Sequence, residues 1–169
     1  MTQKIEVRMT DIAAHGLIRK ADHTGFTVKS LDDSLSFWVD ILGFNHLYTN
    51  NYEASEFLDN VVGVKGASMT LAMVEAPCGH LIELLEYHAP QDTEDYSPRS
   101  CDVGSVHLAF YVTNLEQLLQ KIETVGWLRL GTIQTVQDGV RRGLSLAYAR
   151  SSDGITLEFL QLPDTPEVA

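Results

Sequence analysis

GHLIELLE at residues 79–86 and GITLEFLQ at residues 154–161 are two versions of one short pattern. Each begins with glycine and places a glutamate between apolar residues, so that Glu83 aligns with Glu158. Each stretch has the composition of a buried strand, and a lone carboxylate there costs several kcal/mol of desolvation unless a group of opposite charge pairs with it. The two glutamates therefore need a partner.

A second pair of matching stretches lies upstream of each glutamate. DHTGFTVKSLDDSL, from residue 22, aligns with VHLAFYVTNLEQLL, from residue 106, and this alignment matches His23 with His107 and Phe26 with Phe110. Two matched pairs in the same order indicate an internal duplication, and we interpret the chain as two copies of one module.

Each copy is predicted to fold as βαβββ. Residues after Ser30 carry apolar side chains at helical spacing, Ser30 is a suitable N-cap, and Gly43 is a natural helix stop. The elements expected in the first copy are a strand at 21–29, a helix at 30–42 and strands at 44–49, 67–75 and 80–87. Those expected in the second copy are a strand at 105–112, a helix at 115–125 and strands at 130–136, 143–150 and 155–162.

The repeat also predicts how the chain is divided. We expect an N-terminal extension at 1–20, a first module at 21–88, a linker at 89–103, a second module at 104–163 and a C-terminal tail at 164–169. Glu83 follows His23 by 60 positions, whereas Glu158 follows His107 by 51. The surplus lies in residues 48–66, which we interpret as a loop or short helix that covers a pocket.

Composition and charge exclude several classes of function. The chain has 169 residues, 44% of them hydrophobic and 21% charged, as is typical of a soluble globular protein. Its net charge of -11 disfavours nucleic acid and anionic membranes as partners. The first residues lack the apolar region of a signal peptide, and no apolar run approaches the length of a membrane span. Cys78 and Cys101 form no CxxC pair, so we expect free thiols in a cytoplasmic protein.

The four repeated polar residues predict a metal site. Side chains at i and i+2 of a strand share a face, so His23 lies beside Gly25 and His107 beside Ala109, with room for a ligand. Two imidazoles and two carboxylates suit one divalent cation such as Ni, Co, Zn, Mn or Fe(II). A single histidine on a strand is more often a core residue, and a glutamate there often marks an edge. Because the histidine and the glutamate recur at equivalent positions in both copies, a metal site is favoured over these alternatives.

With this pattern the chain resembles the vicinal oxygen chelate superfamily, which includes glyoxalase I and methylmalonyl-CoA epimerase. The resemblance is carried by residues 21–44, by LIELLEY and SVHLAFYV, and by DGITLEFLQLP. It implies an α+β fold in which two tandem βαβββ modules form a half-open mixed β-barrel around the metal. It also implies that the metal ligands are His23, Glu83, His107 and Glu158.

The resemblance further implies a metal-dependent isomerase, epimerase or lyase that moves a proton next to a carbonyl of a small substrate. Glu158 would be the base, and Glu83 its counterpart on the opposite face. Lactoylglutathione lyase is an alternative, although glyoxalase I of bacteria has an arginine where this chain has Thr27. Methylmalonyl-CoA epimerase is similar around His23 but usually has glutamine in place of Glu83. Residues 63–90 also resemble epimerases of sugar-like cyclitols.

Two other classes stay open at this point. Extradiol dioxygenases use Fe(II) on a three-ligand set that corresponds to His23, His107 and Glu158, and a metal-free binding or drug-resistance protein would lack the ligand set. Arg141, Arg142 and Lys65 are candidates for contact with an anionic substrate, although solvated surface residues are an equally good interpretation. The family habit and the acidic surface suggest a homodimer.

Overall fold

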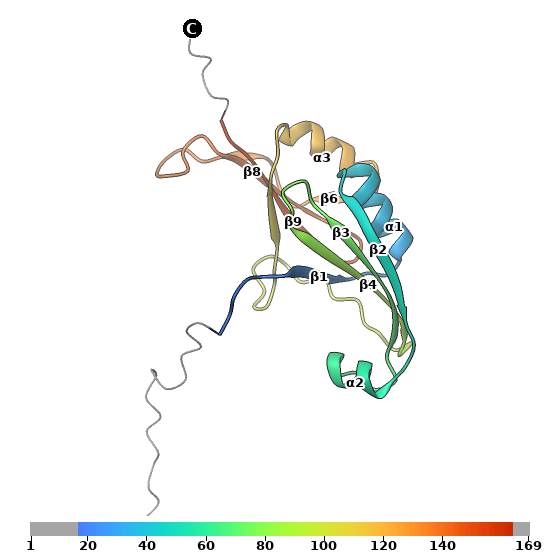
Figure 1. Ribbon diagram of the computed structural model, residues 1–169. Helices are drawn as coiled ribbons and strands as arrows, with labels where there is room; N and C mark the ends of the chain where they lie inside the picture. Colours follow the sequence, from blue (N-terminus) through green and yellow to red (C-terminus); the bar gives the residue numbers. More distant parts are fainter. Residues whose placement is uncertain (1–16, 164–169) are drawn as a thin grey trace, which may run out of the picture.

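The computed structural model describes residues 17–163 and shows two modules, each built on its own mixed sheet (Figure 1). In the first sheet the strand order is β1-β4-β3-β2, with β1 parallel to β4 and the other neighbours antiparallel. The elements of this module are β1 (His23–Thr27), α1 (Leu31–Leu35), η2 (Ser36–Ile41), β2 (Asn45–Tyr52), α2 (Glu56–Val62), β3 (Ser68–Glu75) and β4 (Leu81–Ala89).

The second module repeats this topology. Its path is β5-β9-β8-β6, β7 also pairs with β8, and β5 is parallel to β9 as β1 is to β4. Its elements are β5 (Leu108–Tyr111), α3 (Leu115–Glu123), β6 (Leu128–Arg129), β7 (Gln134–Thr135), β8 (Ser145–Arg150) and β9 (Thr156–Gln161). The predicted α+β class is confirmed. The two sheets share no strand and do not close into one barrel among the described residues.

Local signals place the helices where the sequence predicts them. The side chain of Ser30 accepts a hydrogen bond from the Asp33 N–H, and that of Asn114 accepts one from Gln117, so both helices begin with a polar cap. The first helix differs from an ordinary α-helix because its second half, η2, is a π-helix. It ends before Gly43, whose φ of 76° lies in the left-handed region.

One predicted strand is wrong in its extent. In place of one strand at 130–136, the structure has two pieces of two residues each: β6 at 128–129, just before the predicted range, and β7 at 134–135, inside it. Gly131 lies between them, and the residues between the pieces are mostly exposed. A segment in which alternate side chains are not buried against the core gains little from pairing in the sheet, so the ladder of hydrogen bonds is interrupted there.

The surplus segment of the first module contains α2. Ser55 caps this helix, which ends at Gly63 with a φ of 71°. Leu58 of α2 is buried in a small cluster with Ala67 and Met69, and Leu85 and Tyr87 of β4 pack against this cluster. Since Met69 pairs with Tyr87 and Met73 with Glu83, the cluster lies on the Glu83 face of the sheet. Helix α2 therefore covers one end of that face.

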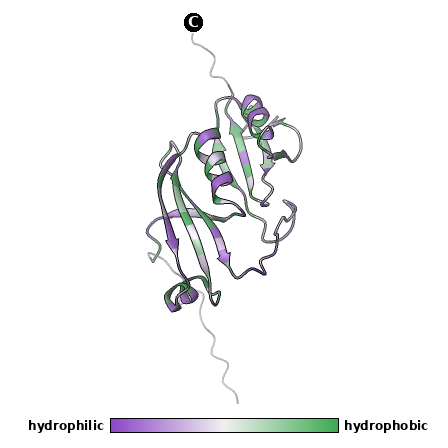
Figure 2. Ribbon diagram, turned by 90° about the vertical axis from the view of Figure 1, so that its right-hand side faces the viewer, coloured by the Kyte–Doolittle hydropathy of each residue, from purple (hydrophilic) through white to green (hydrophobic). Residues whose placement is uncertain are grey.

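The opposite faces of both sheets form one shared core. Ile82 and Leu84 of β4 are fully buried on this side, as are Leu157 and Phe159 of β9. Helices α1 and α3 lie on the same side of the strands (Figure 1), and hydrophilic and hydrophobic residues alternate along helices and strands (Figure 2). The two modules are thus joined through their helix layer.

Aromatic rings tie the modules together. Phe37 of η2 stacks on Trp127 of the second module with ring centroids 4.1 Å apart. Trp38 lies between Phe26 of the first module and Phe110 of the second, at centroid distances of 5.9 and 6.3 Å. Such pairs add to the energy of burial, and they fix one orientation of the modules.

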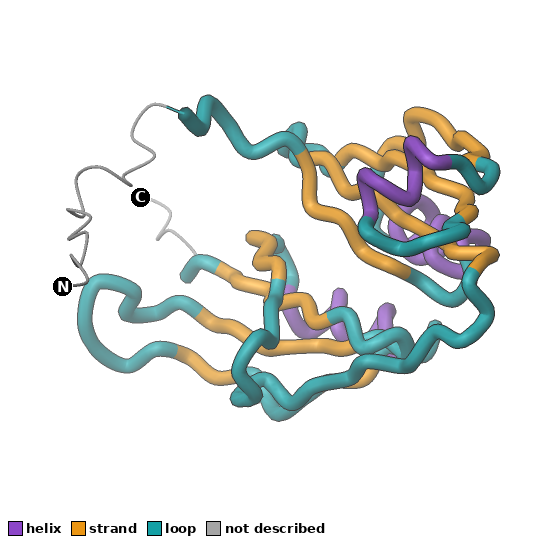
Figure 3. The backbone as a smooth tube through the Cα atoms, turned by 90° about the horizontal axis from the view of Figure 1, so that it is seen from below, coloured by secondary structure: helices purple, strands orange, loops and turns teal. Residues whose placement is uncertain are grey.

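The segment between the modules packs on both of them. Lys29 donates a hydrogen bond to Asp95 at 2.9 Å, and Gly154 approaches the backbone of Tyr96 closely. The two groups of strands are seen side by side in Figure 3. Among residues 17–163, no helix has both the length and the apolar character that crossing a membrane requires. The predicted tail and most of the N-terminal extension lie outside the described residues.

Candidate functional site

The first His–Glu pair lies on neighbouring parallel strands. Gly25 of β1 is the partner of Glu83 in β4, and His23 precedes Gly25 by two positions on the same face. The His23 Nε2 atom is 3.3 Å from the Glu83 Oε2 atom. Their side chains are 35% and 19% exposed, so solvent or a ligand reaches the pair from one side.

Asp22 orients this histidine. Its carboxylate is 3.1 Å from His23 Nδ1, and this hydrogen bond is the main reason why the pKa of Asp22 lies below its usual value. An ionised carboxylate at Nδ1 favours the tautomer that carries its proton there. The Nε2 lone pair is then directed toward Glu83 and remains free to bind a cation.

The second pair has the same construction. Ala109 of β5 is the partner of Glu158 in β9, and the His107 Nε2 atom is 3.4 Å from the Glu158 Oε2 atom. Glu158 is only 14% exposed, which answers the question of its partner within the chain: it faces an imidazole. The two copies therefore place one histidine and one carboxylate at equivalent register positions.

Tyr148 is an additional polar group beside the second pair. It is the cross-strand partner of Glu158 in β8, and its hydroxyl lies 3.3 Å from His107 Nε2. Burial raises the pKa of the Tyr148 hydroxyl, and the charge of Glu158 raises it further, so this group stays protonated in the neutral range. Tyr148 can thus donate a hydrogen bond to His107 or to a bound ligand.

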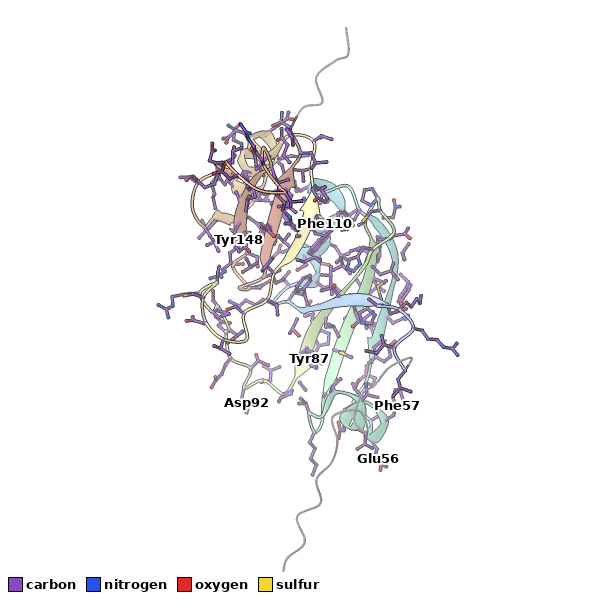
Figure 4. All side chains as sticks on the ribbon, turned by 90° about the vertical axis from the view of Figure 1, so that its left-hand side faces the viewer. Glu56, Phe57, Tyr87, Asp92, Phe110 and Tyr148 are labelled. Carbon is purple, nitrogen blue, oxygen red and sulfur yellow. The ribbon has the colours of Figure 1, made fainter. Side chains whose placement is uncertain are left out.

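Small residues keep space beside each glutamate. An added Cβ at Gly25 would come within 3.5 Å of Glu83 Oε2, and Ala109 holds the corresponding place next to Glu158. Figure 4 looks at the molecule from the side opposite the helix layer, where Tyr87 of the first sheet and Tyr148 of the second are labelled. The two His–Glu pairs thus lie on the strand faces opposite helices α1 and α3.

Each pair has a spacing that suits two ligands of one ion. Ligand atoms at about 2.0–2.2 Å from a cation, at right or tetrahedral angles, are about 3.0–3.5 Å apart. However, residues 17–163 contain no group of three or more histidine, cysteine, aspartate or glutamate side chains close enough to hold a metal ion. The convergence of all four side chains is therefore not seen within one chain. The helix layer explains this, because it joins the modules on the faces that the pairs do not occupy.

The three basic candidates lie apart from both pairs. Arg141 and Arg142 are exposed in the turn between β7 and β8, and Lys65 is exposed just after α2. Within the described part of the chain, none of the three makes a hydrogen bond or ion pair with His23, Glu83, His107 or Glu158. Their role in substrate binding stays a prediction.

Sequence reasoning missed Asp22 and Tyr148. Asp22 directly precedes His23, and an acidic neighbour of a candidate ligand is a signal that could have been used. Tyr148 could have been found by pairing the last two predicted strands as a hairpin, which places it opposite Glu158.

A cavity of about 740 Å³ lies at the junction of the modules and is lined by Phe44, Cys78 and Phe110 among other residues. Neither His–Glu pair lines this cavity.

Residues 22–148 match the family model described as the glyoxalase/bleomycin resistance protein/dioxygenase superfamily. The chain belongs to this superfamily, as its duplicated fold also indicates. It is 29% identical to a 2-epi-5-epi-valiolone epimerase of Actinomyces over 83% of this chain and 78% of that protein. It is 27% identical to a probable lactoylglutathione lyase of Synechocystis over 82% of this chain and 92% of that protein.

Solved structures also share the fold, and two of them come from Bacillus cereus and Listeria monocytogenes. A glyoxalase family protein of Bacillus cereus matches with a TM-score of 0.75 and 23% identity, over 89% of this chain and 99% of that one. The fosfomycin resistance protein FosX of Listeria monocytogenes, solved with Mn(II) and sulfate, matches with a TM-score of 0.55 and 14% identity, over 89% and 96%. A superfamily neighbour thus binds a divalent metal.

Proposed function

We propose that this chain is a metal-dependent epimerase or isomerase that moves a proton on a carbon next to a carbonyl group. The observation that carries the proposal is the repeated His–Glu pair, with donor atoms 3.3 Å apart in one module and 3.4 Å apart in the other. The names of both relatives, an epimerase and a lyase, support chemistry of this type.

The four residues of the two pairs have two proposed roles, metal binding and proton transfer. His23 and His107, with Glu83 and Glu158, would hold one divalent ion such as Ni, Co, Zn, Mn or Fe, each pair providing two donors. When bound, such an ion polarises the substrate carbonyl and acidifies the adjacent C–H bond. Glu158 takes that proton and returns it, and Glu83 serves the opposite face of the carbon.

A polyhydroxylated cyclic ketone is the substrate class that we propose first, because the relative with 29% identity is a 2-epi-5-epi-valiolone epimerase. Lactoylglutathione is the second candidate, on the name of the other relative. The structure has Thr27 on the face of His23, where an arginine would be needed for a glutathione carboxylate. We therefore rank the cyclic ketone above the thioester.

Solvent deuterium exchange tests the function directly. Purified protein reconstituted with Ni²⁺, Co²⁺ or Mn²⁺ is incubated with each compound in D₂O, and NMR follows deuterium at the carbon beside the carbonyl. We expect exchange and inversion with the cyclic ketone, lost on Glu158→Gln. Exchange in neither compound, with oxygen consumption on an Fe(II)-loaded sample and a catechol, would favour the dioxygenase alternative instead.

A further inference from the structure

The duplicated fold has two equivalent cavities at the junction of its modules. Each lies where the end of β1 or β5 meets the turn that precedes the glutamate strand of the other module. One cavity is lined by residues 26–29 and 153–156, and the other by residues 110–113 and 76–78. The repeat that matches Phe26 with Phe110, and Gly154 with Gly79, makes the two positions equivalent.

The chain itself covers the first of these cavities. The segment between the modules forms part of its wall, and Asp95 of this segment accepts a 2.9 Å hydrogen bond from the Lys29 ammonium group. An added Cβ at Gly154 would collide with the backbone of the same segment. A lysine–carboxylate pair therefore holds the covering segment in place, and a space of about 430 Å³ is left beneath it.

The second cavity is not covered in this way by the described part of the chain. An added Cβ at Gly79, the counterpart of Gly154, would have none of the described atoms within 4 Å apart from its chain neighbours. The volume of this cavity is about 740 Å³. Small-molecule sites in proteins commonly measure about 300–1,000 Å³. The second cavity therefore has room for a ligand at the position where the first holds a segment of the chain.

The wall of the second cavity is largely apolar and carries a positive charge. Phe44, Phe110 and Phe159 line it, and the rings of Phe44 and Phe110 meet edge to face with centroids 5.6 Å apart. Lys121 of α3 is the only charged side chain among the described residues of this wall, in a chain whose net charge is -11. Its ammonium group donates a 3.5 Å hydrogen bond to the Ile41 carbonyl and joins none of the ion pairs in the described part of the chain. An ammonium group has three N–H donors, so it can also bind a carboxylate.

We propose that this cavity binds a small aromatic carboxylate, with the acid group on Lys121 and the ring against the phenylalanine side chains. Aromatic rings pack favourably on one another in edge-to-face or offset arrangements. The lysine–carboxylate contact repeats the one that Lys29 and Asp95 make in the equivalent cavity. Neither His–Glu pair lines this cavity, so the inference does not rest on the proposed function.

Cys78 reports on this cavity directly. It is an exposed thiol that lines the cavity, whereas Cys101, also exposed, lies in the segment between the modules and does not line it. Metal-free protein is alkylated with iodoacetamide, with and without 1-naphthoate as the probe, and mass spectrometry follows each cysteine. With the probe at about ten times its dissociation constant, mass action predicts that Cys78 reacts about 10-fold more slowly and Cys101 at an unchanged rate. Protection of neither cysteine, or of both equally, overturns the site.

Charge variants test the recognition of the acid group. Lys121→Met removes the charge and should weaken 1-naphthoate binding about 3–10-fold, whereas Lys121→Arg should retain it. Isothermal titration calorimetry gives the dissociation constants, and circular dichroism checks that each variant is folded. Lys65→Met, at an exposed lysine outside the cavity, is the matched control. The neutral 1-naphthamide should bind the wild type less tightly than 1-naphthoate does.

Three further outcomes overturn the proposal. Equal binding of 1-naphthamide and 1-naphthoate, or unchanged binding by Lys121→Met, contradicts recognition of an acid group. Weaker binding by Lys65→Met places the probe outside the cavity. A Cys78 that is protected without any probe, and that reacts faster in Lys121→Met, indicates that the cavity is covered by Asp164 and Glu167 of the chain's own tail or, where protection rises with protein concentration, by a second copy.

Discussion

Glu158 is the side chain on which the proposed proton transfer depends most directly. It is 14% exposed and 3.4 Å from His107, whereas Glu94 in the segment between the modules is exposed. Glu158→Gln keeps the size of the side chain but removes the carboxylate that we propose as the base, so we expect deuterium exchange to fall about 10²–10⁴-fold. NMR exchange rates measure this, with Glu94→Gln as the control that should retain full activity. Equal rates for the two variants would contradict the role of Glu158.

Asp22 gives a second prediction at this scale. Its hydrogen bond to His23 Nδ1 holds the imidazole so that Nε2 is free for an ion. Asp22→Asn should weaken Co²⁺ affinity about 10–100-fold, as loss of an outer hydrogen-bond partner typically does. A spectroscopic Co²⁺ titration measures the dissociation constant. Asp92→Asn, an exposed substitution in the segment between the modules, is the matched control, and equal affinity of both variants would show that Asp22 has no such role.

The pairing of individual residues was predictable only in part. The repeat in the sequence identified His23, Glu83, His107 and Glu158, since equivalent positions in two copies carry the same residue types. It did not reveal that each histidine meets the glutamate of its own module. Distances between strands depend on register and on how the modules dock, and neither is encoded in one short motif.

At the scale of elements, Gly154 in the turn before β9 holds a position that tolerates no side chain. Its φ is 84°, and an added Cβ would collide with the backbone oxygen of Tyr96. Gly154→Ala should therefore lower the free energy of unfolding by more than about 3 kcal/mol. Gly139→Ala is the matched control, because Gly139 has a φ of 79° with open space around it, and should cost about 1–2 kcal/mol.

Denaturant unfolding of both variants provides the comparison. The difference between them isolates the contact with the segment that joins the modules, since the left-handed backbone is common to both. Equal losses of stability would mean that the segment between the modules moves away from the added methyl group with no loss in the free energy of unfolding. In that case the linker would not help to fix the position of β9 and of Glu158.

Element predictions were reliable where local signals agree. Polar caps at Ser30 and Asn114 and a left-handed Gly43 define helices that the sequence shows directly. The strand predicted at 130–136 failed because its residues lack a buried side, and only tertiary packing decides whether such a segment stays in a sheet. The π-helical half of the first helix has no signature in its apolar spacing.

For the whole molecule, the shared core makes the two modules one cooperative unit. Trp38 is 1% exposed and contacts Phe26 of the first module and Phe110 of the second. Trp38→Ala should cost about 3–5 kcal/mol, and unfolding should remain a single transition. Far- and near-ultraviolet circular dichroism in urea follows this, with the fully exposed Val140→Ala as control. Two separate transitions in the wild type would contradict the shared core.

The duplicated fold was predictable from the sequence, but the relation between its copies was not. Repeats of strand and helix patterns reveal two modules, and the same patterns fit modules that face each other or modules that stand side by side. Within one chain the modules stand side by side, because the helix layer packs them into one shared core. The strand faces that carry the two His–Glu pairs stay accessible in this arrangement, with residues exposed along β1 and β5.

Metal content is the measurement that tests the central claim most directly. Elemental analysis is made on the untagged wild type, on Glu83→Gln and on Glu158→Gln, each after reconstitution and removal of loose ions. The account predicts about one divalent ion per chain in the wild type and a clear loss in both variants, because each ion needs a carboxylate from either module. A wild type without metal, or variants that keep the full amount, would contradict it.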